Sequence, residues 1–286
     1  MSEPTHEPAG SNSNSYVPTA EFLAACEAAG VLFDPGDLEK LEAYLRLLLE
    51  TNRQFNLTAV TDPAQGWMRH IYDALTLLPL LDACAEDEAK PATDDGAEGG
   101  AAPTAEPRED RRAAGRPKQV IDVGSGGGLP GIPLAVARPD VRFTLLEATG
   151  KKAEFLARVT AELGLSNVEV LRERAETVGQ DHRRWRERFD AVMARAVGPL
   201  PVLLELTVPL ARVGGVVLAI KGERAGEEIE AAKAALHALH AAVIDTIRTP
   251  TGTIVVIEKR RPTPRLYPRL PGEPKRRPLG GARSGE

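Results

Sequence analysis

The stretch VIDVGSGGGLPGIPLAVARPD, residues 120–140, leads from an apolar strand into a helix through a turn with four glycines in five positions. Glycine lets the backbone adopt left-handed conformations and come close to a ligand. In α/β proteins a turn of this kind follows the first parallel strand and holds a nucleotide-like cofactor. ATP, NAD and S-adenosylmethionine are all candidates, and the rest of the chain has to decide between them.

Around this turn, short apolar runs alternate with helical patterns. We expect helices over 131–138, 150–165, 200–211 and 225–240. We expect strands over 119–124, 141–148, 168–173, 189–196, 214–222, 242–249 and 252–260. The alternation predicts an α/β fold with a mainly parallel seven-stranded sheet covered on both faces. Only Pro250-Thr251 joins the last two strands, so the last strand is expected to run antiparallel.

The flanking segments differ in composition, and they divide the chain into five parts. We expect a disordered tail at 1–18, helices at 19–81, a disordered acidic and Ala-Pro-Gly-rich insertion at 82–118, the cofactor domain at 119–261 and a basic Pro-rich tail at 262–286. Thr19 is expected to cap the first helix, and Asp34 with Pro35 to start the second. Residues 69–81 read as a third helix.

Composition bounds the class of protein. The chain has 286 residues, is 42% hydrophobic and carries a net charge of −5, which gives no overall nucleic-acid signature. Its cysteines, Cys26 and Cys84, do not suggest a structural disulfide. We find no signal-peptide pattern and no apolar run of membrane-spanning length. We therefore expect a soluble, cytoplasmic, monomeric protein without a metal.

The glycine pattern discriminates between the cofactors. ATP is excluded, because no Gly-Lys-Ser/Thr ends the turn. NAD stays open, since Gly126, Gly128 and Gly131 satisfy G-x-G-x-x-G and Glu147 lies near the distance of a ribose-binding acid. Against NAD, Pro130 interrupts the phosphate-binding stretch and donates no N–H, and the terminal hairpin does not fit two mononucleotide-binding halves.

S-adenosylmethionine suits the turn better, because it has no phosphate and carries a cationic sulfonium. In the register Asp-Val-Gly-Ser-Gly-Gly-Gly, Asp122 offers a carboxylate near the turn. Glu147, at the end of the second strand, is expected to accept both ribose hydroxyls. The predicted cofactor contacts from this reasoning are Asp122, Gly124, Ser125, Gly126, Gly128 and Glu147.

Five motifs in this order resemble one family, the ribosomal RNA small subunit methyltransferase G family. They are NLTAVTDP with RHIYDALTLL, VIDVGSGGGLPGIPLAVARPD, FDAVMARAV, AIKG and YPRLPGEPKRRPL. The resemblance spans about residues 19–279 apart from the insertion. It implies a Rossmann-like class I methyltransferase with N-terminal helices, which moves methyl from S-adenosylmethionine to guanine N7 in the 530 loop of 16S rRNA in the 30S subunit. It implies cofactor contacts at Gly124, Leu129, Ala175, Glu176 and Arg195.

Arg195 is the expected catalytic residue. Guanine N7 has a free lone pair, so methyl transfer needs no general base, and catalysis comes from alignment. Arg195 ends the fourth strand at the edge where α/β folds bind ligands. A structural ion pair with a carboxylate is the competing interpretation. Asn56, Thr58, His70 and Asp73 are expected to form a lip near the substrate.

Basic residues predict the rRNA contact. Lys151 and Lys152 open a helix, and Lys221 ends the fifth strand. In the basic tail, Arg265, Arg269 and Arg276 are expected to meet phosphate. Two further alternatives stay open: a small-molecule methyltransferase of the same fold, and a non-catalytic binding protein with an Arg-rich tether.

Overall fold

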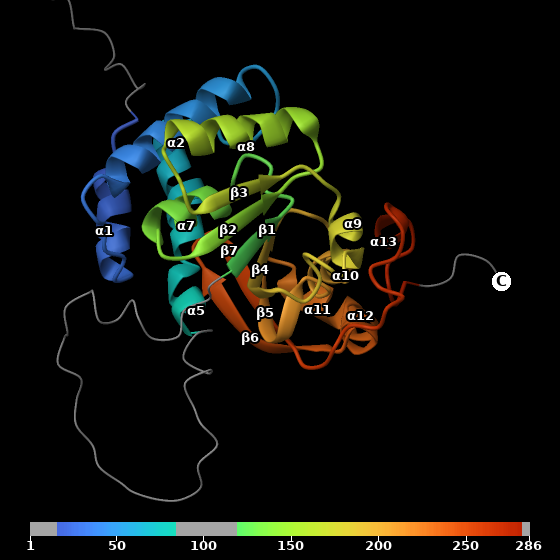
Figure 1. Ribbon diagram of the computed structural model, residues 1–286. Coiled ribbons are helices and arrows are strands. Elements are labelled where there is room, and N and C mark those ends of the chain that lie inside the picture. The colour runs from blue at the N-terminus through green and yellow to red at the C-terminus, as the bar shows by residue number, and fades with distance from the viewer. Residues whose placement is uncertain (1–15, 84–118, 282–286) are drawn as a thin grey trace, which may run out of the picture.

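The computed structural model describes residues 16–83 and 119–281 (Figure 1). Nearly all of the predicted tail 1–18 and insertion 82–118 lies outside the described residues, so the disorder expected there stays a prediction. Asp82, at the edge of the insertion, belongs to a helix instead. Its carboxylate accepts a hydrogen bond from Arg138 Nη2 at 2.7 Å, which ties this helix to the cofactor domain.

Seven strands form one sheet in the order β3-β2-β1-β4-β5-β7-β6. The strands are β1 (Gln119–Val123), β2 (Arg142–Leu146), β3 (Val168–Leu171), β4 (Phe189–Arg195), β5 (Ala211–Lys221), β6 (Ala241–Thr249) and β7 (Gly252–Lys259). Strands β1 to β5 pair in parallel, and β7 pairs antiparallel with both β5 and β6. The predicted mainly parallel sheet with an antiparallel last strand is confirmed.

The strand order also fixes where a ligand fits. From β1 the chain crosses to β2 and β3 on one side, and then returns to β4 on the other side. The carboxyl ends of β1 and β4 therefore border the switch point of the sheet, which is where open α/β sheets bind ligands. The glycine turn follows β1 at this point.

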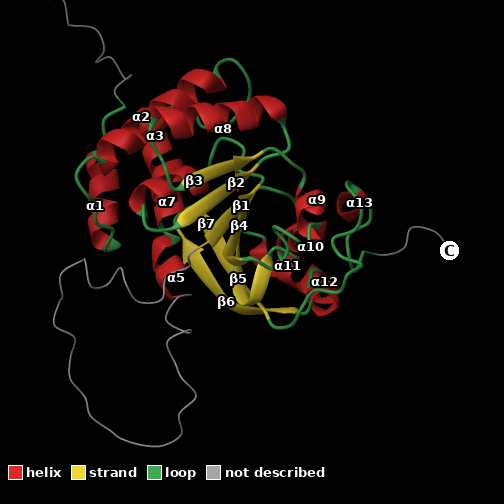
Figure 2. Ribbon diagram, viewed as in Figure 1, coloured by secondary structure: helices red, strands yellow, loops and turns green. Residues whose placement is uncertain are grey.

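Helices cover both faces of the sheet (Figures 1 and 2). One layer holds α1 (Ala20–Ala28), α2 (Asp37–Asn52), α7 (Gly131–Ala137) and α8 (Gly150–Glu162), and the other holds α9 (Ala175–Gln180), α10 (Leu200–Thr207), α11 (Ala225–Ala231) and α12 (Lys233–Leu239). Each layer buries its own hydrophobic cluster against the sheet. None of the helices in the described residues is long and apolar enough to cross a membrane.

The first two helices begin in different ways. Thr19 caps α1 as predicted, because its Oγ1 accepts a hydrogen bond from Phe22 N at 3.1 Å. The predicted start of α2 at Asp34 and Pro35 is wrong. These residues form a turn in which Asp34 N donates to Asp37 Oδ2 at 2.8 Å. Gly36 is the N-cap and has a φ of +90°, outside the helical region, so α2 begins only at Asp37.

The predicted helix 69–81 is part of a longer and interrupted helical run. It consists of α3 (Pro63–Gly66), the π-helical turn η1 (Trp67–Tyr72), α4 (Asp73–Leu75) and α5 (Leu78–Ala83). The run begins early because Asp62 Oδ1 accepts from Gln65 N at 2.8 Å and caps the first turn. The wider π turn carries His70, and such turns are frequent at functional sites.

The C-terminal segment, residues 262–281, packs against the domain instead of extending from it. It contains the short helix α13 (Glu273–Arg276), which lies beside α9 and α10 (Figure 1). Buried Arg186 donates four hydrogen bonds of 2.6 to 3.2 Å to the carbonyl oxygens of Gly179, Thr263, Pro264 and Tyr267. The sequence suggested a tail because the partners that fix this segment are distant in the chain.

Candidate active site

The glycine turn is held in a left-handed conformation by the end of the neighbouring strand. Gly124, Gly126 and Gly128 have φ values of +74°, +57° and +92°, which favour glycine over other residues. Glu147, just beyond β2, accepts hydrogen bonds from Gly126 N at 3.0 Å and from Thr149 N at 2.7 Å. The carboxylate of Glu147 therefore orients the turn while it lies at the edge of a cavity.

Two cavities meet at this turn. The larger, of about 610 Å³, is lined by residues of the glycine turn, the end of β4 and the N-terminal helices, among them Gly126, Leu129, Arg69, His70, Lys152 and Arg195. The smaller, of about 210 Å³, is lined by Glu147, Ala175, Glu176, Val197, Pro274 and Lys275 among others. Gly124 lines both, so they adjoin at the carboxyl end of β1.

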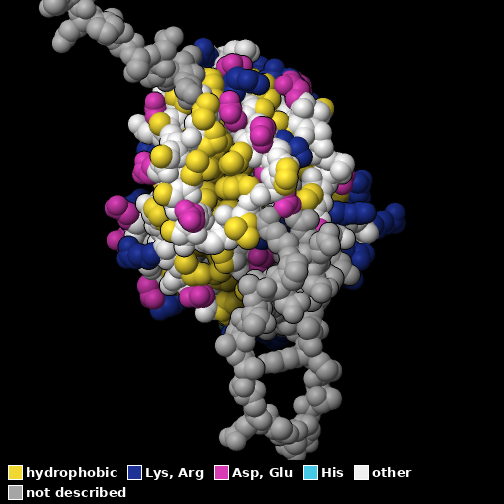
Figure 3. Space-filling model, turned by 90° about the vertical axis from the view of Figure 1, so that its left-hand side faces the viewer, with side chains coloured by type: hydrophobic (Ala, Val, Ile, Leu, Met, Phe, Trp, Pro, Cys, Tyr) yellow, Lys and Arg dark blue, Asp and Glu magenta, His cyan; other side chains and the backbone are white. Residues whose placement is uncertain are grey.

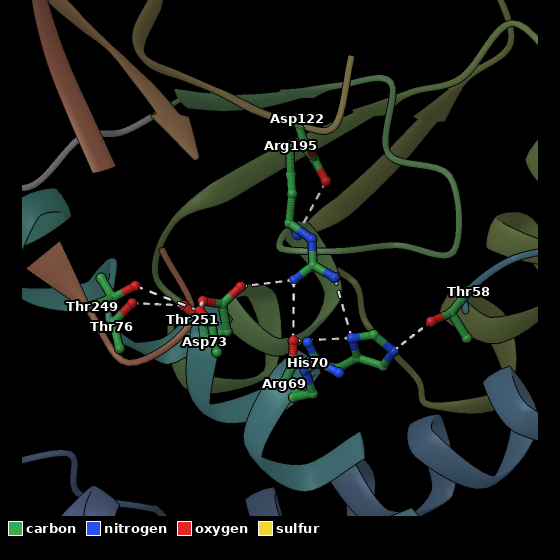
Figure 4. A network of polar contacts seen from close by, with 10 residues as sticks. Thr58, Arg69, His70, Asp73, Thr76, Asp122, Arg195, Thr249 and Thr251 are labelled. Atoms are coloured by element: carbon green, nitrogen blue, oxygen red, sulfur yellow. Dashed lines mark hydrogen bonds and ion pairs between the residues drawn. The ribbon is translucent and has the colours of Figure 1, made fainter. Parts of the chain in front are cut away.

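Arg195 is the centre of a polar network whose residues line the larger cavity (Figure 4). Its Nη1 donates to Asp73 Oδ2 at 2.8 Å, and its Nη2 lies 3.2 Å from His70 Nδ1. His70 Nε2 in turn lies 2.6 Å from Thr58 Oγ1. Asp73 also accepts from Thr251 on the β6–β7 turn. Of the predicted lip residues, Thr58, His70 and Asp73 thus form one connected group with Arg195, whereas Asn56 does not line the cavity.

The charge states of the network follow from burial. Burial, together with the charge of Arg195, lowers the pKa of His70 to about 4, so its ring is neutral at pH 7. Burial raises the pKa of Asp73, and the charge and hydrogen bond of Arg195 oppose that rise. Arg195 therefore does form the ion pair with a carboxylate that the competing interpretation expected. The Arg195 side chain is still 23% exposed and lines the cavity.

Asp122 is not in the place that the sequence suggested. It is 1% exposed and lines neither cavity. Its Oδ2 accepts from Gly131 N at 3.1 Å, and its Oδ1 has no hydrogen-bond partner within the described residues. Burial raises the pKa of Asp122 to about 7, against the Gly131 hydrogen bond. Asp122 therefore supports the turn from below, through its hydrogen bond to Gly131 N.

Most of the other predicted cofactor residues lie on a cavity wall. Gly124, Ser125, Gly126 and Leu129 line the larger cavity, and Glu147, Ala175 and Glu176 line the smaller one. Gly128 lines neither. A Cβ there would lie 2.6 Å from Ile132 Cγ1, so this glycine is needed for packing of the turn on α7.

The predicted basic residues of the domain separate into two groups. Lys152 lines the larger cavity, whereas Lys151 is exposed outside both cavities. Lys221 lines the larger cavity too, but its Nζ pairs with Glu228 and donates to Gly198 O, each at 2.7 Å. Lys221 therefore supports the cavity wall, and its charge is already compensated.

The C-terminal segment contributes differently from what its composition suggested. Arg269 forms a forked pair with Glu205, which is fully buried, with contacts of 2.8 and 2.5 Å. This side chain has a structural partner, while Arg265 and Arg276 remain exposed. Glu176 Oε1 accepts from Gly272 N at 2.7 Å and so fixes the same segment. Pro274 and Lys275 reach the smaller cavity, which no local pattern indicated.

Two further residues of the site were missed. Asn52 Oδ1 accepts from Leu57 N at 2.7 Å and Thr58 N at 2.9 Å, and so holds the loop beside the cavity. Thr251 lies in a turn that the sequence marked only as a hairpin connection. Neither position carries a periodic signal, because each acts through a contact made by folding.

Comparison with known proteins gives consistent results. A family model described as rRNA small subunit methyltransferase G matches residues 37–100 and 111–251. A ribosomal RNA small subunit methyltransferase G of Sorangium cellulosum is 44% identical over 251 residues, which cover 88% of this chain and 92% of that protein. The protein of the same name from Halalkalibacterium halodurans is 36% identical, covering 91% and 98%.

The solved structures agree on the fold. A putative O-methyltransferase from Klebsiella pneumoniae superposes with a TM-score of 0.50 at 13% identity, over 85% of this chain and 97% of that chain. At this identity the likeness concerns the architecture alone. The class I methyltransferase fold predicted from the sequence is thereby confirmed.

Proposed function

Because the chain belongs to the ribosomal RNA small subunit methyltransferase G family, we propose that it transfers methyl from S-adenosyl-L-methionine to N7 of a guanine in the 530 loop of 16S rRNA. The observation that carries this proposal is the junction of two unlike cavities at Gly124. One is small and offers carboxylate and apolar groups, and the other is large and bordered by cations. A methyl donor bound in the small cavity and an acceptor bound in the large one would meet where the two cavities adjoin.

The smaller cavity fits the adenosine part of the donor. Glu147 is 7% exposed, and each of its oxygens accepts one backbone N–H, which leaves lone pairs for ribose hydroxyls. Val197, Val202 and Leu206 supply apolar walls for a base. At Gly126 a Cβ would have no neighbour closer than 3.8 Å, so the turn is open on the ligand side. The methionine part would lie along Gly124, Ser125 and Leu129.

The larger cavity fits the acceptor. When bound, S-adenosylmethionine supplies an electrophilic methyl group, and the lone pair of N7 attacks it without any proton being removed. Accordingly, the residues of this chain have to align and exclude water. Arg195 is placed to donate to the guanine O6 or to phosphate, since N7 must stay free. The neutral His70 is not required as a base.

The rRNA contact would use the basic rim of the larger cavity and the exposed part of the C-terminal segment. Arg69 and Lys152 border the cavity, and Arg265 and Arg276 are exposed on the segment. Figure 3 shows the side of the N-terminal helices, where both signs of charge surround a hydrophobic strip. Over the described residues visible there, charges of both signs are interspersed, so we place the RNA on the cavity side, where Arg69 and Lys152 border the larger cavity.

The test is methylation of the RNA itself. Purified protein, radiolabelled S-adenosylmethionine and small subunits from cells that lack this gene should give one N7-methylguanine, located by chemical cleavage in the 530 loop. Arg195→Ala should reduce methylation at least about 100-fold, and calorimetry on the variant shows how much of that loss comes from weaker binding of S-adenosylmethionine. Label in free small acceptors but not in 16S rRNA would instead support a small-molecule methyltransferase. Absence of cofactor binding in calorimetry would support a non-catalytic role.

A further inference from the structure

We propose that His70 and Asp73 are positioning residues, which fix the guanidinium of Arg195 so that its remaining donors face the acceptor base. This inference rests on the proposed function and assigns roles within the same site. It concerns the polar network of Figure 4, in which an arginine from β4 meets two residues of the interrupted N-terminal helical run. The network brings together segments 122 residues apart in the chain.

The hydrogen-bond inventory of Arg195 shows which donors remain. A guanidinium has five N–H donors. Nη1 uses its two on Asp73 Oδ2 at 2.8 Å and, weakly, on Arg69 O at 3.4 Å. Nη2 uses one on His70 Nδ1 at 3.2 Å. Within the described residues, Nε–H and one N–H of Nη2 have no partner, and a carbonyl oxygen such as guanine O6 has two lone pairs to accept them.

Two contacts of His70 Nδ1 require opposite tautomers of the ring, because Arg195 Nη2 lies at 3.2 Å and the acceptor Arg69 O at 3.0 Å. Arginine only donates, so the 3.2 Å contact is a hydrogen bond only if Nδ1 of His70 carries no proton. Nε2–H then donates to Thr58 Oγ1 at 2.6 Å, and the same oxygen accepts from Val60 N at 3.1 Å. With its proton on Nε2 the ring accepts from Arg195 and donates to Thr58, whereas with its proton on Nδ1 it would donate to Arg69 O and leave Arg195 Nη2 without this acceptor. The proposal assigns the first of these two forms.

Asp73 holds the other side of the guanidinium. It is 7% exposed, so its carboxylate has little access to water and needs protein partners. Oδ2 accepts from Arg195, and Oδ1 accepts from Thr251 of the β6–β7 turn. Through this carboxylate the arginine is fixed between the helical run and the hairpin. A displacement of about 1 Å in such a group can cost on the order of 100-fold in rate.

Isosteric replacements of His70 test the assignment. Asparagine places an acceptor near the position of Nδ1, whereas glutamine places its amide near that of Nε2. We expect His70→Asn to stay within about threefold of the wild type in kcat/KM for methylation of small subunits. We expect His70→Gln and His70→Leu to lose about 10- to 100-fold, mainly in kcat. The Kd for S-adenosylmethionine should change less than twofold in all three, because within the described residues the ring of His70 contacts Thr58, Arg69 and Arg195 and makes no hydrogen bond to Glu147 or the glycine turn.

A double-variant comparison shows whether His70 acts through Arg195. In the Arg195→Ala background, His70→Gln should cost less than about twofold in single-turnover methylation. Exposed His237 on α12 gives the matched control, His237→Gln, which should retain wild-type rates. Circular dichroism and thermal melting identify any variant that fails to fold, and Thr251→Val then provides a milder perturbation of the same network.

Different results would contradict the positioning role of His70 and the proposed function. Equal activity of all His70 variants, equal loss in all of them, or rescue by glutamine and not by asparagine would each overturn the positioning role. The positioning role would also be overturned if His70→Gln lowered the methylation rate as much in the Arg195→Ala background as it does in the wild type. If the wild-type protein does not methylate 16S rRNA at all, the proposed function fails instead, and the His70 comparison is then made on the acceptor that is found.

Discussion

Replacing Arg186 by methionine should destabilise the protein by about 3 kcal/mol and release the C-terminal segment. Arg186 is 5% exposed and donates to four carbonyl oxygens, three of them within residues 262–281. Hydrogen bonds to a charged group contribute about 1.5–3 kcal/mol each. The desolvation of a buried guanidinium costs several kcal/mol and offsets more than half of that sum. Methionine keeps the apolar volume but leaves the four carbonyls without their donor.

Two measurements check this expectation. For a domain of this size, about 3 kcal/mol corresponds to a fall in melting temperature of about 6–12 °C. Limited trypsin digestion, with fragments identified by mass, should cleave after Arg265 much faster in the variant, because that backbone is no longer held. Arg183→Met, an exposed arginine of the same loop, is the matched control and should change neither measurement. An unchanged melting temperature and an unchanged cleavage rate in Arg186→Met would refute the reasoning.

Three further predictions follow from single side chains. Glu147→Gln should raise the Kd for S-adenosylmethionine about 10- to 100-fold in calorimetry, because the amide cannot accept from Gly126 N, Thr149 N and the ribose together; Glu147→Asp is the control, and an unchanged Kd would remove this side chain from the cofactor site. Folding raises the pKa of Asp122 from 3.8 to about 7, so the stability this group contributes is present at low pH and lost as the pH rises through 7. Between pH 5 and pH 8 the wild type should lose about 2–4 kcal/mol that Asp122→Asn retains, measured by urea unfolding, and equal pH slopes would contradict this. Lys259→Met should cost about 1–3 kcal/mol, because it leaves Glu187 and two carbonyls without their donor, and adding Glu187→Leu should restore part of the loss.

Local patterns were sufficient for the architecture. Alternating apolar strands and helical stripes depend on neighbours within a few residues, so the seven strands, the parallel arrangement and the antiparallel end could be predicted. The glycine turn and Glu147 were predictable for a related reason. Left-handed backbone needs glycine, and a residue at the end of a parallel strand lies at the ligand edge wherever the strand is placed. The first residues of the helices that begin at Pro63 and Asp37 were harder to predict, since several neighbouring residues could each serve as the N-cap.

The tertiary structure decided the contacts between segments that are distant in the chain. The sequence marks Arg195 as a strand-end cation, but only folding brings Asp73 and His70 against it and decides which of its donors stay free. Asp122 looked like a ligand carboxylate, and burial beneath the turn made it a support. The basic C-terminal segment looked like a tail, and its anchors at Arg186 and Glu205 lie far upstream. Composition records the charge of a residue, whereas its partner is set by the packing of the whole chain.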